Sequence, residues 1–172
     1  MFCPEILIID VDGVLTPGNF YYSENGKIIK SFGADDSDAL KLISDYIKVI
    51  FVSGDKRGFS ISEKRINDMG YNLNFVSTLK RIDWIKERYN PNKVIYIGDG
   101  IFDFLVMKEV GYSICIKDGD ELALKYASYI TSNKGGDRAI AECVRHIFKI
   151  FFNTKSIEDI IILKSQSNDK DS

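Results

Sequence analysis

Short runs of apolar residues alternate with longer amphipathic segments along most of the chain. Four runs are apolar on both faces and rich in β-branched residues: residues 6–9, 49–52, 94–97 and 112–116. Such runs are typical of parallel strands that are covered by helices on both sides. Weaker strand candidates are residues 74–76 and 129–131.

Helical patterns fill the intervals between these runs. They cover residues 37–46, 59–68, 80–89, 102–110, 121–126 and 137–152. This alternation predicts an α/β fold with a doubly wound parallel sheet. With no second-domain linker in the sequence, we expect a single domain over residues 1–153.

One segment breaks the alternation. Residues 19–32 contain two short strand patterns joined at Asn25-Gly26, a strong signal for a β-hairpin. Because this segment follows the first strand directly, it predicts a small flap over that end of the sheet. Residues 154–172 are predicted to be a C-terminal tail whose polar end is disordered.

Composition narrows the classes of partner and compartment. A chain of 172 residues with a formal net charge of −2 has no basic surface for nucleic acid or an anionic membrane. No apolar stretch is long enough to span a bilayer, and the N-terminus lacks the basic segment of a signal peptide. The three cysteines are widely spaced, which favours a reducing compartment. We therefore expect a cytoplasmic protein that binds neither nucleic acid nor membrane.

The candidate chemistry lies at the predicted strand ends. Ligands of parallel α/β sheets bind beyond the carboxyl ends of the strands. Polar residues at or just after these ends are Asp10, Asp12, Ser53, Lys80, Asp99 and Asp103. Strand alternation would turn Asp10 and Asp12 to the same side, which is costly unless a cation lies between them.

This set of residue types favours phosphoryl transfer. Several carboxylates in one pocket suit Mg²⁺, which prefers oxygen ligands and substrate phosphate. One carboxylate can attack phosphorus to give an aspartyl-phosphate, and a second can transfer the proton. Two non-enzymatic alternatives are a receiver-like signalling module and a catalytically silent binding protein of related fold.

The ordered motifs resemble a known family. The segments DVDGV, VSGD and GDGIFD, with Lys80 between the last two, are similar to the four-motif signature of the haloacid dehalogenase-like (HAD) phosphohydrolases. Longer matches over residues 5–148 resemble the 3-deoxy-D-manno-octulosonate 8-phosphate phosphatases. The resemblance implies a Rossmann-like, capless fold that assembles as a homotetramer.

The resemblance also implies catalytic roles. Asp10 would be the nucleophile and Asp12 the general acid/base. Ser53, Gly54 and Lys80 would bind the phosphoryl group.

A metal site follows from the same resemblance. Mg²⁺ would be held by Asp10, the backbone carbonyl of Asp12 and Asp99. Asp103 would order the surroundings of the metal.

Three departures from the family pattern concern the substrate. Asp35 and Asp55 stand where the octulosonate phosphatases usually carry arginine, and a later arginine falls on Ala141, with Arg138 nearby. Asp35, Asp55 and Arg138 are therefore candidate substrate contacts. The added negative charge would favour a neutral or amine-bearing sugar phosphate over an anionic sugar acid.

The predicted activity is hydrolysis of a small sugar or sugar-acid phosphomonoester. The expected setting is the biosynthesis of a surface polysaccharide, either capsule or lipopolysaccharide. The alternative substrate is octulosonate 8-phosphate itself.

Overall fold

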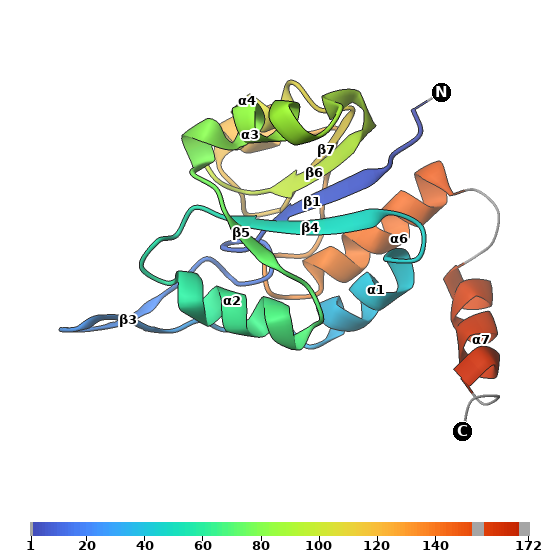
Figure 1. Ribbon diagram of the computed structural model, residues 1–172, viewed down its shortest axis with the longest axis horizontal. Helices are drawn as coiled ribbons and strands as arrows, with labels where there is room; N and C mark the ends of the chain where they lie inside the picture. Colours follow the sequence, from blue (N-terminus) through green and yellow to red (C-terminus); the bar gives the residue numbers. More distant parts are fainter. Residues whose placement is uncertain (1, 153–156, 169–172) are drawn as a thin grey trace.

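A six-stranded parallel sheet forms the centre of the molecule (Figure 1). The computed structural model describes residues 2–152 and 157–168. The strands, in spatial order, are β5 (Leu73–Phe75), β4 (Lys48–Ser53), β1 (Ile6–Asp10), β6 (Val94–Gly98), β7 (Tyr112–Cys115) and β8 (Tyr129–Ile130). All five pairings between neighbouring strands are parallel. The doubly wound parallel sheet is thus confirmed.

Helices cover both faces of this sheet (Figure 1). On one face lie α1 (Asp35–Ile43), α2 (Phe59–Asp68) and α6 (Ala139–Phe151). On the other lie α3 (Arg81–Arg88), α4 (Phe104–Met107) and α5 (Glu121–Tyr126). Two single-turn 3-10 helices, η1 (Thr78–Lys80) and η2 (Pro91–Lys93), precede α3 and β6.

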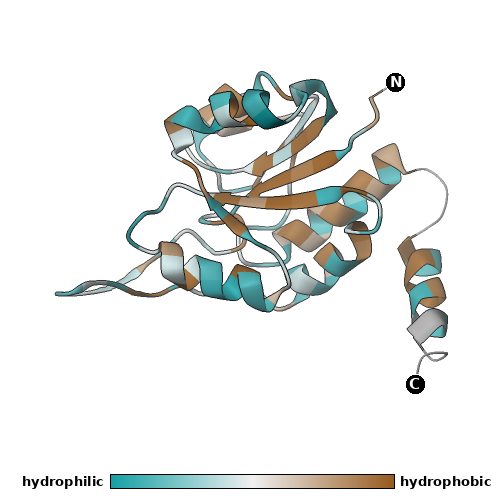
Figure 2. Cartoon of the chain, viewed as in Figure 1, coloured by the Kyte–Doolittle hydropathy of each residue, from teal (hydrophilic) through white to brown (hydrophobic). Residues whose placement is uncertain are grey.

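Strand alternation divides the core into two apolar layers. In β1, Leu7 and Ile9 pack toward α1 and α6, whereas Ile8 packs toward α3 and α4. All three side chains are fully buried. The strands are therefore continuously hydrophobic, while the helices turn polar faces outward (Figure 2).

The predicted hairpin is present. β2 (Tyr21–Ser23) and β3 (Gly26–Ile29) pair antiparallel in a separate two-stranded sheet. In Figure 1 this hairpin extends from the edge of the molecule at which β1 and β4 end. Between β1 and β4 the chain forms the hairpin and α1, in agreement with a capless fold.

The last helix, α7 (Ile157–Asn168), extends into the segment for which the sequence predicts a disordered polar end. Residues 157–168 contain neither glycine nor proline, so no residue there interrupts a helix. Ile160 is buried, and Lys164 Nζ lies 2.8 Å from Asp45 Oδ2 in the turn after α1. Residues 169–172 lie outside the described residues. In the part of the chain that the structure describes, no helix has the length and apolarity needed to cross a bilayer.

Candidate functional site

Three adjacent strands place their last residues at one edge of the sheet. β4 ends at Ser53, β1 at Asp10, and β6 at Gly98, which Asp99 follows. Because β1 lies between β4 and β6, these side chains come from the middle of the sheet. The structure therefore brings Asp10, Ser53 and Asp99 together at the carboxyl edge of the sheet, the rim, as the sequence predicts.

Asp10 forms an ion pair with Arg81, a residue that was not among the candidates predicted from the sequence. Arg81 Nη1 donates to Asp10 Oδ2 over 2.8 Å, and Nη2 lies 3.4 Å from Oδ1. The backbone N–H of Val11 also donates to Asp10 Oδ1. Burial raises the pKa of Asp10 to about 6, although Arg81 acts in the opposite direction. The ion pair thus fixes a carboxylate that is expensive to ionise in isolation.

Asp103 and Tyr96 complete the surroundings of this arginine. Arg81 Nη1 also donates to Asp103 Oδ1 and to the hydroxyl of Tyr96, which in turn donates to Asp103 Oδ1. The other oxygen of Asp103 accepts the backbone N–H groups of Asp99 and Gly100. Both oxygens of Asp103 are therefore engaged in orienting its neighbours.

Lys80 does not lie where the sequence predicts it. It is the last residue of η1, its side chain is 78% exposed, and its Nζ lies 3.7 Å from Asp83 Oδ2. Arg81, the first residue of α3, is fully buried at the rim instead. The sequence pattern places Lys80 at the start of a helix, but η1 occupies residues 78–80. The following residue consequently carries the inward-facing cation.

Asp12 lies in the turn after β1 and has separate partners. β1 ends at Asp10, so strand alternation does not turn the two carboxylates to one side. Ser53 Oγ donates to Asp12 Oδ2 over 3.1 Å, and Lys30 Nζ lies 2.6 Å from Asp12 Oδ1. Each of the two carboxylates thus has a cationic side chain of its own: Arg81 pairs with Asp10, and Lys30 pairs with Asp12.

Gly54 lies just beyond β4 in a tight environment. A Cβ atom there would lie 3.2 Å from Thr78 Cγ2 and 3.4 Å from the Thr78 backbone nitrogen. The start of η1 thus packs directly against the end of β4. This packing keeps Gly54 beside Ser53 at the rim.

Asp99 provides the clearest candidate ligand for a cation. One oxygen each from Asp10, Asp99 and Asp103 lie within 4.8 Å of one another. Asp99 Oδ1 is buried and accepts no hydrogen bond within the described residues. Burial and then the neighbouring carboxylates, Asp10 first, raise the pKa of Asp99 to about 8. A divalent cation would relieve this concentration of negative charge, so the site fits Mg²⁺.

Gly13 makes room for Asp99. Its φ is +87°, and a Cβ atom at this position would lie 1.9 Å from Asp99 Oδ2. The turn after β1 is closed by Thr16, whose Oγ1 accepts the backbone N–H of Gly13. Glycine at position 13 therefore lets the loop and the Asp99 carboxylate approach closely.

The candidate substrate contact Asp55 is paired within the chain. Lys27 Nζ lies 2.6 Å and Lys30 Nζ 2.9 Å from Asp55 Oδ2. Burial acts to raise the pKa of Asp55, but hydrogen bonds from these lysines outweigh it and lower the pKa to about 2. Two lysines of the hairpin segment thus compensate the charge that an aspartate introduces here.

The other two candidates pair with each other. Arg138 Nε donates to Asp35 Oδ2, and both side chains are more than half exposed. They line a cavity of about 220 Å³ between the start of α1 and the loop before α6. The backbone of Arg138, the residue that precedes α6, has a left-handed φ of 61°. Because Asp35 and Asp55 both have cationic partners, their charges do not argue against an anionic substrate.

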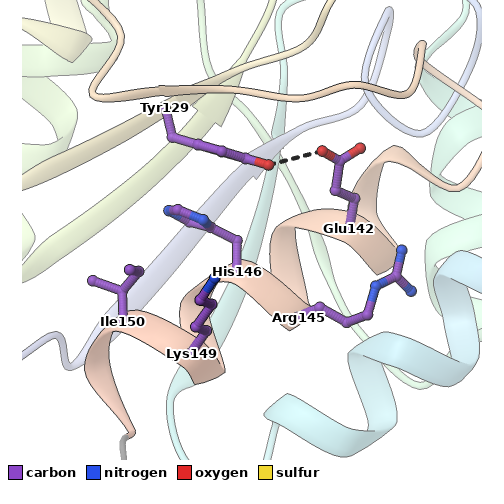
Figure 3. Close-up of a pocket in the computed structure, with 6 residues that line it drawn as sticks. All are labelled: Tyr129, Glu142, Arg145, His146, Lys149 and Ile150. Carbon is purple, nitrogen blue, oxygen red and sulfur yellow. Dashed lines mark hydrogen bonds between the residues drawn. The ribbon is translucent and has the colours of Figure 1, made fainter.

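A separate pocket of about 400 Å³ lies on α6 (Figure 3). In it the Tyr129 hydroxyl donates to Glu142, and His146 stacks on the Tyr129 ring at 3.6 Å. Its lining residues are Tyr129, Glu142, Arg145, His146, Lys149 and Ile150. None of the rim residues lines this pocket.

Comparisons with known proteins agree with this geometry. A family model described as haloacid dehalogenase-like hydrolase matches residues 76–144. The 3-deoxy-D-manno-octulosonate 8-phosphate phosphatase of Yersinia pestis is 33% identical over 144 residues, which are 80% of this chain and 76% of that protein. The Escherichia coli K12 enzyme of the same name is 31% identical over 145 residues, with the same coverage of both chains.

A solved structure of a related phosphatase has a similar fold. The cobalt-bound deoxy-D-mannose-octulosonate 8-phosphate phosphatase of Haemophilus influenzae aligns with a TM-score of 0.76 at 30% identity. The alignment covers 85% of this chain and 88% of that one.

Proposed function

Because this chain belongs to the haloacid dehalogenase-like hydrolases and is a phosphatase related to the octulosonate 8-phosphate enzymes, we propose that it hydrolyses a small sugar or sugar-acid phosphomonoester through an aspartyl-phosphate. The observation that carries this proposal is the placement of Asp10 and Asp12 at one rim with different partners. Arg81 pairs with Asp10, while Ser53 and Lys30 hold Asp12. Two carboxylates in distinct environments suit distinct roles.

Asp10 is the proposed nucleophile. Its carboxylate oxygen forms a bond to phosphorus, and the bond from phosphorus to the sugar oxygen breaks. Asp12 donates a proton to that leaving oxygen and then accepts a proton from the water that attacks the aspartyl-phosphate. Phosphate leaves and Asp10 is regenerated. The guanidinium of Arg81 provides positive charge beside the transferring group. The single O–H of Ser53 donates to Asp12 Oδ2, so phosphate binding by Ser53 would require this hydroxyl to turn away from Asp12.

The proposed cofactor is Mg²⁺. Asp10, Asp99 and the backbone carbonyl of Asp12 would hold it, while Asp103 orients the backbone N–H groups of Asp99 and Gly100. When bound, the ion neutralises the carboxylates and the substrate phosphate. The buried, unpartnered Asp99 Oδ1 and the all-oxygen donor set support this assignment.

The proposed biological setting is the biosynthesis of a surface polysaccharide sugar. Octulosonate 8-phosphate itself is the second candidate substrate, because Asp35 and Asp55 are neutralised by Arg138 and by the hairpin lysines. This pairing removes the main argument for a neutral or amine-bearing sugar.

We also propose a homotetramer. The hairpin exposes Tyr21, Tyr22, Ile28 and Ile29, each more than half accessible. Apolar side chains gathered on a protruding element are typical of a surface that packs against another chain.

The test is phosphate release from a panel of sugar phosphates with and without Mg²⁺. Asp10→Asn should abolish turnover, whereas Asp38→Asn, at an exposed aspartate of α1, should retain it. Unchanged turnover in Asp10→Asn would rule out the mechanism. A clear preference within the panel would identify the substrate.

A further inference from the structure

A buried ion-pair network joins the hairpin to the rim. Lys30 follows the last residue of β3 and is 6% exposed, with a fully buried side chain. Its Nζ lies 2.6 Å from Asp12 Oδ1 and 2.9 Å from Asp55 Oδ2, and it donates to Ser62 Oγ over 2.8 Å. These partners come from the turn after β1, the loop after β4 and α2.

Three side-chain oxygens lie within 3 Å of the Lys30 ammonium nitrogen. An ammonium group carries three N–H bonds and no acceptor. The ion pairs with Asp12 and Asp55 and the hydrogen bond to Ser62 thus engage this ammonium with neighbouring side chains. Burying an ammonium is also costly unless it is paired and hydrogen-bonded. Lys30 is therefore suited to holding its neighbours in place.

The neighbour that matters for the reaction is Asp12. Lys30 holds Oδ1, and Ser53 Oγ holds Oδ2. The Ser53 hydroxyl in turn accepts the backbone N–H of Asp55, and the Asp55 carboxylate returns to Lys30. These contacts form a closed network that fixes the orientation of the Asp12 carboxylate at both of its oxygens.

We propose that Lys30 is a positioning residue that aims Asp12 at the leaving-group oxygen, with Asp55 and Ser62 holding Lys30 in place. This inference rests on the proposed function, because it assigns proton transfer to Asp12. It links the hairpin segment to the chemistry through the contact of Lys30 with Asp12. Lys27 also pairs with Asp55, but within the described residues it forms no ion pair or hydrogen bond with Asp12, so it is a suitable control.

The test varies the leaving group. The kcat/KM of Lys30→Met is measured for p-nitrophenyl phosphate, phenyl phosphate and an alkyl phosphate, in order of increasing need for a proton. We expect a loss below about 5-fold for p-nitrophenyl phosphate and about 100-fold for the alkyl phosphate, since a general acid contributes on the order of 100-fold or more. Lys27→Met should keep the wild-type dependence on the leaving group, and Lys30→Arg should restore part of it.

Asp12→Asn supplies the reference. It should show the same steep dependence, and the double variant Asp12→Asn, Lys30→Met should lose little more. An equal loss for all three substrates would overturn the inference, because it would indicate substrate binding or general distortion. If Lys30→Met does not fold, Ser62→Ala provides the milder test, with a smaller steepening expected. Activity that survives in both Asp10→Asn and Asp12→Asn would instead refute the proposed function.

Discussion

Lys80 and Arg81 are adjacent residues of equal charge, yet their environments are opposite. Arg81 is fully buried between Asp10 and Asp103, and Lys80 is exposed. Arg81→Met should lower kcat/KM by roughly 100-fold or more, because the transferring phosphoryl group loses a preorganised cation. Removing one partner of a buried ion pair also costs about 3–5 kcal/mol of stability. Steady-state kinetics and thermal unfolding measure the two effects.

Lys80→Met is the matched control for Arg81→Met. Substitution at an exposed position should change the free energy of unfolding by no more than about 0.5 kcal/mol. We expect kcat/KM to stay near the wild-type value. A large kinetic loss in Lys80→Met with a small one in Arg81→Met would contradict the assignment of Arg81.

Gly13 allows a test of Asp99 as a metal ligand. Gly13→Ala places a Cβ atom onto the Asp99 carboxylate, so we expect weaker Mg²⁺ binding in a calorimetric titration. Gly70→Ala is the control, because Gly70 has a nearly equal φ of +85° but open space around it. Both variants carry the strain of a left-handed residue, whereas Gly13→Ala alone displaces a proposed ligand. Equal Mg²⁺ affinity in the two variants would argue against Asp99 as a ligand.

The sequence predicts some of these residues and misses others for a physical reason. Asp10, Ser53 and Asp99 directly follow or end apolar runs, so their placement at the rim follows from strand direction. The choice between Lys80 and Arg81 depends on where η1 changes into α3, which hydrophobic periodicity does not resolve. Lys30 lies in a hairpin segment, and its burial depends on Asp12, Asp55 and Ser62 from distant segments.

At the scale of elements, the hairpin segment carries both paired lysines and exposed isoleucines. Lys27 and Lys30 face Asp55, while Ile28 and Ile29 are exposed. Ile29→Glu should therefore disrupt the proposed tetramer without removing the lysine contacts. Light scattering measures the mass in solution. Ile150→Glu, at an exposed isoleucine of α6, is the control that should leave the mass unchanged.

A tetramer that survives Ile29→Glu would show that the hairpin is not required for assembly. The existence of the hairpin could be predicted, because Asn25-Gly26 lies between two short strand patterns. Its docking could not be predicted, since the partners of its lysines are far away in the sequence. The continuation of α7 beyond Lys164 could not be predicted either, because polar composition alone does not distinguish a solvated helix from a disordered tail.

At the scale of the molecule, the alternation of strands and helices determines most of the fold. Each apolar run of the predicted sheet is a strand, and even the weak runs form β5 and β8 at its two edges. The central position of β1 follows from double winding, which places the first strand between the two halves. The electrostatic balance of the rim could not be predicted in this way, because Asp10, Asp99 and Asp103 approach only in the folded chain.

The raised pKa values of the rim carboxylates make the stability of the metal-free protein depend on pH. The pKa of Asp99 is about 8 in the fold and 3.8 in the reference state. Between these values the folded protein holds a proton that the unfolded chain has released, so the free energy of unfolding falls as pH rises. Asp10, with a pKa of about 6, acts in the same direction. We therefore expect the Tm of the metal-free protein to decrease from about pH 5 to about pH 8.

Mg²⁺ should oppose this decrease, because a bound cation replaces the protons on the carboxylates. The rise in Tm on adding Mg²⁺ should accordingly grow with pH, as ligand binding to the folded state predicts. Asp99→Asn should flatten the pH dependence and remove most of the Mg²⁺ effect, whereas the exposed Asp38→Asn should change neither. A metal-free Tm that is constant over this range, or a full Mg²⁺ effect in Asp99→Asn, would show that Asp99 does not couple metal, proton and fold.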